Sequence, residues 1–97
     1  MWVFSSALVF LTNMGHARFR PERLAEKLLQ IREELGLSQK EMAKRLAELA
    51  GIKITDKNIS KYERGRSVPF IEIVLAYARA ANVEMNEIVD DDLELNL

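Results

Sequence analysis

Apolar residues recur at helical spacing in the part of the chain that follows residue 20. The first stripe repeats at intervals of four, three and four residues and consists of Leu24, Leu28, Ile31 and Leu35. This spacing places the stripe on one face of a helix. Pro21 suits its first turn, because proline has no backbone N–H to leave unpaired there. Gly36 can adopt the positive φ that often ends a helix. The pattern predicts a helix over residues 21–35.

A capping pattern opens the second predicted helix. Ser38 and Glu41 form the Ser-x-x-Glu arrangement of a capping box. This arrangement predicts a helix over residues 39–50, which Gly51 then ends. Its inward stripe is expected to consist of Met42, Leu46 and Leu49.

The third predicted helix covers residues 56–64. Thr55 can cap its N-terminus, and Gly65 follows its last residue. Ile59 and Tyr62 are expected to face inward. Residues 52–54 are expected to form a turn before it.

Two further helices complete the predicted fold. Pro69 precedes a helix over residues 70–81, and Asn82 is suited to end it. The side chains expected to face inward from this helix are Ile71, Val74, Leu75 and Ala78. A short helix is predicted over residues 86–89. The fold class is therefore all-α, a compact bundle of five short helices.

Composition excludes several kinds of chemistry. The chain has 97 residues, enough for one domain, with no cysteine and a single histidine, His16. Disulfides, cysteine nucleophiles, thiolate zinc sites and multi-histidine metal sites are therefore excluded. No glycine-rich phosphate loop is present. Asp90, Asp91, Asp92 and Glu94 lack the alternating ligands and central glycine of a calcium loop. We expect no enzyme activity, no cofactor and no metal.

The N-terminal residues differ from the rest of the chain. Residues 1–13 carry no charge and are mostly apolar, but they are too short to span a bilayer. Three interpretations remain open: a start assigned upstream of Met14, a segment used in dimerisation, or a membrane or export signal. Residues 14–20 form a basic arm, residues 21–90 the helical domain, and residues 91–97 an acidic tail. That tail is either frayed or a short strand with one apolar face.

Charge is distributed unevenly along the chain, although the net charge is only −1. Residues 16–66 contain 13 Lys or Arg and 8 Asp or Glu, a local balance of +5. From residue 67 onward, Arg79 is the one basic residue against seven acidic residues. This distribution fits either a solvated surface or a basic face for a polyanion beside an acidic tail.

The predicted helix over residues 56–64 has the polar face that major-groove entry requires. Lys57, Lys61 and Arg64 follow at i, i+4 and i+7, on one stripe. Lysine can donate to guanine, and Asn58 can pair with adenine through two hydrogen bonds. Asp56 can accept from cytosine or support the helix cap. An ordinary exposed surface helix would have the same pattern, so both interpretations stay open.

Three segments together resemble the phage repressor and Cro-type (XRE-like) helix-turn-helix family. They are residues 32–43 (REELGLSQKEMA), residues 55–66 (TDKNISKYERGR) and Pro69. The resemblance covers residues 24–88 and implies a lambda-repressor-like DNA-binding domain of five helices. The helix over residues 56–64 would be the recognition helix in the major groove.

The resemblance also implies roles for individual residues. Those nearest the bases would be Thr55, Asp56, Lys57, Asn58 and Lys61. Those nearer the phosphates would be Gln39, Lys40, Ser60, Arg64 and Arg66. Arg32 and Glu63 would form a structural ion pair between two helices. Residues 47–54 are about six residues longer than the usual turn of such domains. Either the preceding helix is extended or the connector loops outward.

The leading hypothesis is a cytoplasmic transcriptional repressor that binds double-stranded DNA specifically as a homodimer, because one recognition helix reads few base pairs. The dimer surface is expected either at the helix over residues 86–89 with the tail or at the apolar N-terminus. The alternative is an antitoxin or protein-interaction module. Six acidic residues without a basic one between Glu84 and Glu94 suggest a toxin or another protein as partner. No membrane association is expected.

Overall fold

The computed structural model describes residues 21–97 and shows five helices without a strand in that range. The helices are α2 (Leu24–Leu35), α3 (Gln39–Ala50), α4 (Asp56–Glu63), α5 (Ile71–Ala81) and α6 (Met85–Val89). The all-α prediction is confirmed. Three predicted ends were wrong by one residue, because Arg64 and Phe70 lie in the caps of α4 and α5 and α6 begins at Met85. The predicted residues 1–13 and 14–20 lie outside the described residues.

The capping residues explain where α3 begins and α2 ends. The Glu41 amide donates to Ser38 Oγ over 3.0 Å, and the Ser38 amide donates to Glu41 Oε1 over 2.9 Å. This is the reciprocal capping box that the sequence predicts. Gly36 adopts a φ of 69°, and the Leu37 amide turns back to the Arg32 carbonyl. The short turn between α2 and α3 follows from these two features.

The start of α2 corrects the sequence prediction. The helix begins at Leu24 rather than at Pro21, and residues 22 and 23 form a turn. The amides of Glu22 and Arg23 donate to the two carboxylate oxygens of Asp91 over 2.9 and 3.0 Å. A carboxylate distant in sequence therefore accepts from the backbone amides at this end of the helix, where the N-cap residue Arg23 makes no side-chain cap hydrogen bond.

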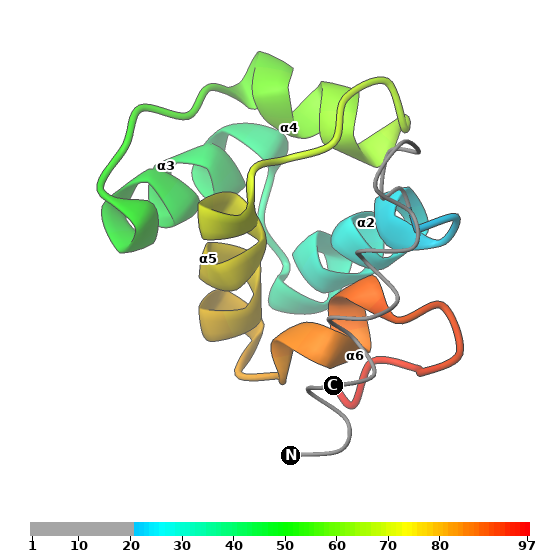
Figure 1. Cartoon of the computed structure of the whole chain (residues 1–97). Helices are drawn as coiled ribbons and strands as arrows, with labels where there is room; N and C mark the ends of the chain where they lie inside the picture. Colours follow the sequence, from blue (N-terminus) through cyan, green and yellow to red (C-terminus); the bar gives the residue numbers. More distant parts are fainter. Residues whose placement is uncertain (1–20) are drawn as a thin grey trace.

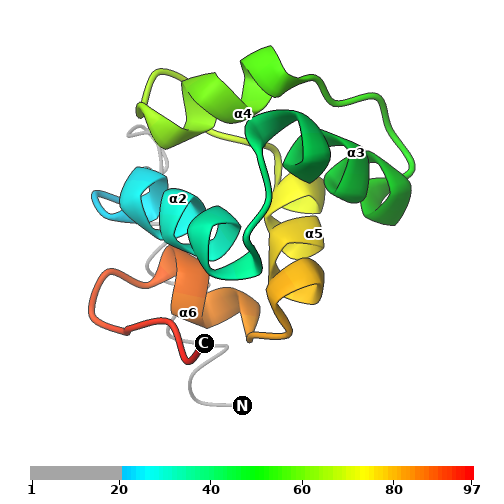
Figure 2. The same ribbon diagram turned by 180° about the vertical axis from the view of Figure 1, so that it is seen from behind.

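The core lies between α5 and the other helices. Figures 1 and 2 show α5 against α3, with α2 and α6 on its other side. The largest fully buried apolar side chains are Leu28, Ile31, Met42, Leu46, Ile59, Tyr77 and Ile88. Burial raises the pKa of the Tyr77 hydroxyl, whose oxygen has no hydrogen-bond partner within the described residues. These contacts, contributed by every helix, fix the relative positions of α3 and α4.

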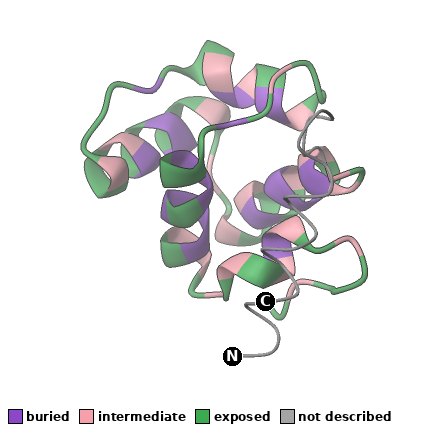
Figure 3. Ribbon diagram, viewed as in Figure 1, coloured by how far each residue is buried: buried purple, intermediate pink, exposed green. Residues whose placement is uncertain are grey.

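Three predicted core residues are not buried. Leu49 of α3 and Ile71 and Leu75 of α5 are exposed, whereas Val74 and Ala78 of α5 are buried as predicted. The predicted inward stripe was wrong at Ile71 and Leu75, because the described residues cover α5 on the side of Ile73, Val74, Tyr77 and Ala78. Figure 3 shows exposed positions along the opposite side of this helix.

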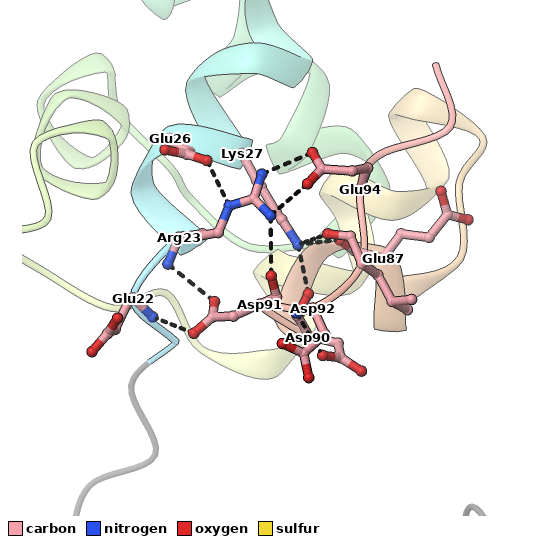
Figure 4. Close-up of polar contacts among 10 residues, drawn as sticks. Glu22, Arg23, Glu26, Lys27, Glu87, Asp90, Asp91, Asp92 and Glu94 are labelled. Atoms are coloured by element: carbon pink, nitrogen blue, oxygen red, sulfur yellow. Dashed lines mark hydrogen bonds and ion pairs between the residues drawn. The ribbon is translucent and has the colours of Figure 1, made fainter.

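The acidic C-terminal segment folds back onto α2. The guanidinium of Arg23 contacts both carboxylate oxygens of Glu94 over 2.7 and 2.8 Å and donates to the Asp91 carbonyl over 3.0 Å. Leu95 packs against the core. Residues 93–97 form no strand. The segment is therefore bound to the domain rather than frayed (Figure 4).

Lys27 is the second anchor of this segment. Its side chain is completely buried, and its ammonium donates to the carbonyls of Glu87, Asp90 and Leu93 over 2.8, 2.7 and 2.7 Å. These carbonyls lie at α6 and in the turn that follows it. A buried ammonium is stable here because its three protons all have acceptors.

No helix among the described residues is both long enough and apolar enough to cross a membrane.

Candidate nucleic-acid interface

The N-terminus of α4 is held by a reciprocal cap. The Asn58 amide donates to Thr55 Oγ1 over 3.3 Å, and the Thr55 amide donates to Asn58 Oδ1 over 2.9 Å. Thr55 Oγ1 also donates to Asn58 Oδ1 over 3.0 Å. The backbone of Thr55 is extended, and the helix begins at the next residue, Asp56. Asp56 in the first turn interacts favourably with the helix dipole.

The two faces of α4 differ sharply in burial and charge. Ile59 and Tyr62 are buried against the core. On the other side, Lys57 and Lys61 are exposed, as is Arg64 in the C-cap. The side chains of Lys57 and Lys61 form no hydrogen bond or ion pair with another residue in the described range. In Figures 1 and 2, α4 lies at one edge of the domain, opposite α6. The helix therefore presents cations that are available to a partner.

Asn58 is positioned differently from the two lysines. It is half-buried, and its Oδ1 accepts two hydrogen bonds from Thr55. Pairing with adenine through two hydrogen bonds needs both Oδ1 and Nδ2. In this geometry Oδ1 is already occupied by the cap, so only Nδ2 is available for a base.

Arg32 and Glu63, the pair implied by the resemblance, are joined by two hydrogen bonds. Arg32 Nε donates to Glu63 Oε2 over 2.6 Å, and Nη2 donates to Oε1 over 3.0 Å. The Glu63 carboxylate raises the pKa of the Arg32 guanidinium. Nη1 of Arg32 donates to the Leu37 carbonyl over 3.0 Å. The pair connects α2 to the last turn of α4 and to the turn before α3.

Gln39 belongs to the same network. Its Nε2 donates to Glu63 Oε1 over 3.1 Å. The first residue of α3 is thereby tied to the last residue of α4, which restricts the angle between the two helices. The sequence suggested a phosphate contact for Gln39 and gave no sign of this role, because its partner lies 24 residues away.

The remaining residues for which the resemblance implies phosphate contacts lie on α3, on α4 and in the turn after α4. Lys40 and Arg66 are exposed, and Ser60 is half-buried. Nε of Arg64 donates to the Ser60 carbonyl over 3.3 Å. Gly65 adopts a φ of 70°, which turns the chain away after α4 and leads to Arg66. Positive φ is strained for residues with a side chain, so glycine is favoured here.

Residues 47–54, which the sequence comparison with the resembled family suggests are longer than usual, are divided between the end of α3 and the connector to α4. The helix α3 continues to Ala50, and residues 51–55 form an extended connector that returns to α4. Gly51 reverses the chain with a φ of 72°, and Ile54 anchors the connector in the core. Because Gln39 and Ile54 fix the two ends of this unit, the longer connector leaves α4 docked beside α3 (Figure 1).

Comparisons with known proteins found one matching family and a similar solved structure. Residues 25–91 match a family described as a helix-turn-helix domain. The structure is similar to that of the P22 c2 repressor protein in complex with synthetic operator 9T, with a TM-score of 0.55 and 23% sequence identity. The similarity covers 71% of this chain and 96% of the repressor chain, and it shows a shared fold. No curated protein sequence matches this chain.

Proposed function

This chain belongs to the helix-turn-helix domain family, and we propose that it is a sequence-specific transcriptional regulator that places α4 in the major groove of double-stranded DNA. Helix-turn-helix domains are DNA-binding modules rather than enzymes. The P22 c2 repressor, which has the same fold, is described in complex with operator DNA. By analogy we propose a repressor-like role for this chain.

The observation that carries the proposal is the distribution of charge on α4. Lys57, Lys61 and Arg64 are exposed, whereas Ile59 and Tyr62 hold the helix against the core. A single α-helix fits the width of the major groove. Exposed cations that form no ion pair within the described residues can replace the counterions of DNA phosphates or donate to guanine.

We assign the interface residues by the exposure of their side chains and by whether their polar atoms already have partners in the domain. Lys57 and Lys61 are exposed and are proposed to read bases, together with Asp56. Asn58 is proposed to contact a base through Nδ2 alone, while Thr55 holds its carbonyl oxygen. Lys40, Arg64 and Arg66 are proposed to contact phosphates. Ser60 and Gln39 are placed at the edge of this surface, because both are partly buried.

An antitoxin or protein-interaction role has less support. That hypothesis rests on the acidic residues near the C-terminus. Asp91 and Glu94 direct their carboxylates to the start of α2 and to Arg23. Much of the acidic charge is therefore engaged within the domain.

Selection of binding sites from a random duplex library tests the proposal. We expect enrichment of a short motif from folded protein at low salt. Absence of any enriched sequence would contradict sequence-specific binding.

Charge-removing variants then locate the contact surface. Lys57→Ala and Lys61→Ala should each weaken binding and relax the base preference of the enriched motif, because both lysines are proposed to read bases. Arg45→Ala is the matched control. Arg45 is exposed on α3, and it lies about 140° around the helix from Lys40. Equal effects of all three variants would indicate nonspecific attraction by net charge.

A further inference from the structure

The connector between α3 and α4 carries an exposed lysine for which the resemblance implies no role. Lys53 lies within residues 47–54, where this chain is longer than the usual turn of the resembled family. Its side chain is exposed and forms no ion pair with another residue of the described range. The ammonium of Lys53 is therefore free to contact a partner, as are the ammonium groups of Lys57 and Lys61.

The backbone that carries Lys53 is fixed on both sides. Before it, the Gly51 amide donates to the Ala47 carbonyl over 2.9 Å at the end of α3. After it, Ile54 is only 8% exposed and belongs to the core, and Thr55 caps α4. A lysine on a fixed backbone orders only its own side chain when it binds a partner, so it loses less conformational entropy than a lysine on a free loop.

The side chain of Lys53 leaves the connector on the side away from the core. Neighbouring side chains of an extended chain point to opposite sides. Ile54 is buried, whereas Lys53 before it and Thr55 after it are exposed, in agreement with this alternation. In Figures 1 and 2 the connector reaches α4 along the edge of the domain that α4 itself occupies, opposite α6. Lys53 is therefore an exposed cation beside the start of α4.

The spacing between Lys53 and α4 is close to the width of the major groove. Asp56, the first residue of α4, follows Lys53 by three positions, so their Cα atoms are at most about 11 Å apart. The major groove is about 12 Å wide, and the sugar–phosphate backbones border it on both sides. If the start of α4 lies in the groove, Lys53 lies at the border, where its ammonium can reach phosphate oxygens rather than base edges.

We propose that Lys53 binds a phosphate of the DNA backbone beside the groove that α4 enters. The inference rests on the proposed function and adds to it a contact that the connector supplies from outside the helices. Lysine binds phosphate as a point charge and needs no fixed orientation. A phosphate contact positions the protein but carries no sequence information. Lys53 therefore raises the affinity for every duplex alike.

Duplex binding by the full chain at several salt concentrations tests this contact. The two probes are the duplex enriched in the selection and a random duplex of the same length. Lys53→Gln keeps most of the side-chain length and removes the charge. It should weaken binding of both probes about tenfold at ~50 mM salt and about threefold at ~200 mM salt. The slope of log affinity against log salt should become shallower by about 1.

Two control variants separate this position from charge in general. Arg79→Gln also removes one positive charge, but from the last turn of α5, which ends beside α6 and not beside α4 (Figure 1). Its affinity should stay within about twofold of the parent, with an unchanged salt slope. Lys53→Arg keeps the charge and should retain the parent slope. Circular dichroism verifies that all three variants remain folded.

Three results would each overturn the proposal. The first is an unchanged salt slope in Lys53→Gln. The second is an equally reduced slope in Arg79→Gln, which would report net charge and not a contact at the connector. The third is a changed motif when the selection is repeated with Lys53→Gln, because it would make Lys53 a base-reading residue.

The random duplex separates this inference from the proposed function. An enriched motif together with an unaffected Lys53→Gln variant would support the proposed function and overturn the phosphate contact. Binding of the random duplex with a slope that Lys53→Gln reduces, but without an enriched motif, would support the phosphate contact and contradict sequence-specific regulation. A folded parent chain that binds neither duplex at low salt would overturn both.

Discussion

Lys27 and Lys57 are both lysines on helices of this domain, but their ammonium groups are used in opposite ways. Lys27 is completely buried and donates to three backbone carbonyls of the C-terminal part of the chain. Lys57 is exposed on α4 and has no partner in the described residues. The same residue type thus closes the fold at one end of the molecule and stays available at the other.

The comparison teaches that local net charge is a poor guide to a binding surface. Both lysines belong to the stretch with an excess of basic residues, and so does Arg23, whose guanidinium is bound by Glu94. The charges that can attract DNA are those left unpaired after folding. On this basis α4 and its flanking residues form the proposed interface, whereas the start of α2 is part of the structural framework.

Removing the buried charge should have the largest effect on stability. Lys27→Met keeps the length of the side chain but loses three hydrogen bonds from a charged donor. We expect the free energy of unfolding to fall by about 3 kcal/mol or more. Urea denaturation followed by circular dichroism measures this change.

Lys57→Met is the matched control for that experiment, with an expected change within about 0.5 kcal/mol. A similar loss of stability in the two variants would remove the distinction between the two ends of the molecule.

Breaking the ion pair behind α4 should have the next largest effect. Glu63→Ala leaves Arg32 and Gln39 without their shared acceptor, at a site where the Arg32 side chain is only 18% exposed. We expect a loss of about 2 kcal/mol in thermal or urea denaturation. Exposed Glu48→Ala on α3 is the control. An unchanged melting temperature for Glu63→Ala would show that the pair does not support α4.

Acid should release the C-terminal segment before it unfolds the core. Hydrogen bonds from the Arg23 and Glu22 amides lower the pKa of Asp91, and Arg23 lowers the pKa of Glu94. Their stabilisation is fully present above the unfolded pKa values of about 4 and is lost as the pH falls through the lower folded values.

Asp91→Asn tests the contribution of this carboxylate directly. We expect a loss of about 1 kcal/mol at pH 7, comparable with the loss of a helix cap. The stability of the variant should also depend less steeply on pH below 4. A pH profile identical to that of the parent chain would contradict a role for the Asp91 carboxylate.

Variants of Asn58 are expected to change stability least, and they separate its role in the helix cap from its proposed contact with a base. Asn58→Asp keeps an oxygen for the cap, so the free energy of unfolding should change by less than about 0.5 kcal/mol, whereas Asn58→Ala should lose up to about 1 kcal/mol. If Nδ2 contacts a base, the aspartate variant should nevertheless show an altered site preference in the duplex selection. Unchanged preference would limit Asn58 to the cap.

Local signals in the sequence were sufficient to predict the five helices. Ser38, Glu41 and Thr55 act on residues within the same turn, so their caps could be predicted without knowing the fold. The start of α2 could not, because its polar partner is Asp91, almost seventy residues away. Periodicity predicts Ile71 and Leu75 in the core, but both are exposed, because periodicity identifies an apolar face and not whether another helix covers it.

The sequence predicts which polar residues share the exposed face of α4, but it does not predict which of them already have hydrogen-bond partners in the domain. The exposed stripe on α4 follows directly from helical spacing. The division between Lys57, which is free, and Asn58, which is held by Thr55, depends on hydrogen-bond geometry. The position of Lys27 could have been noticed in the sequence, because helical spacing places it beside Leu24 and Leu28 on the buried side of α2. A lysine on the apolar side of a helix either extends its ammonium to solvent or, as Lys27 does, buries it against acceptors.

The fold-back of the C-terminal segment has a consequence for how the protein is made. Arg23 and Lys27 are synthesised early, but their acceptors at residues 87–94 are added some sixty to seventy residues later. While the chain is still growing on the ribosome, the first described helix lacks the groups that complete it. Helix α4 and the Arg32–Glu63 ion pair are both synthesised before that point. The domain can therefore reach its full stability only after the ribosome has released the segment that closes it.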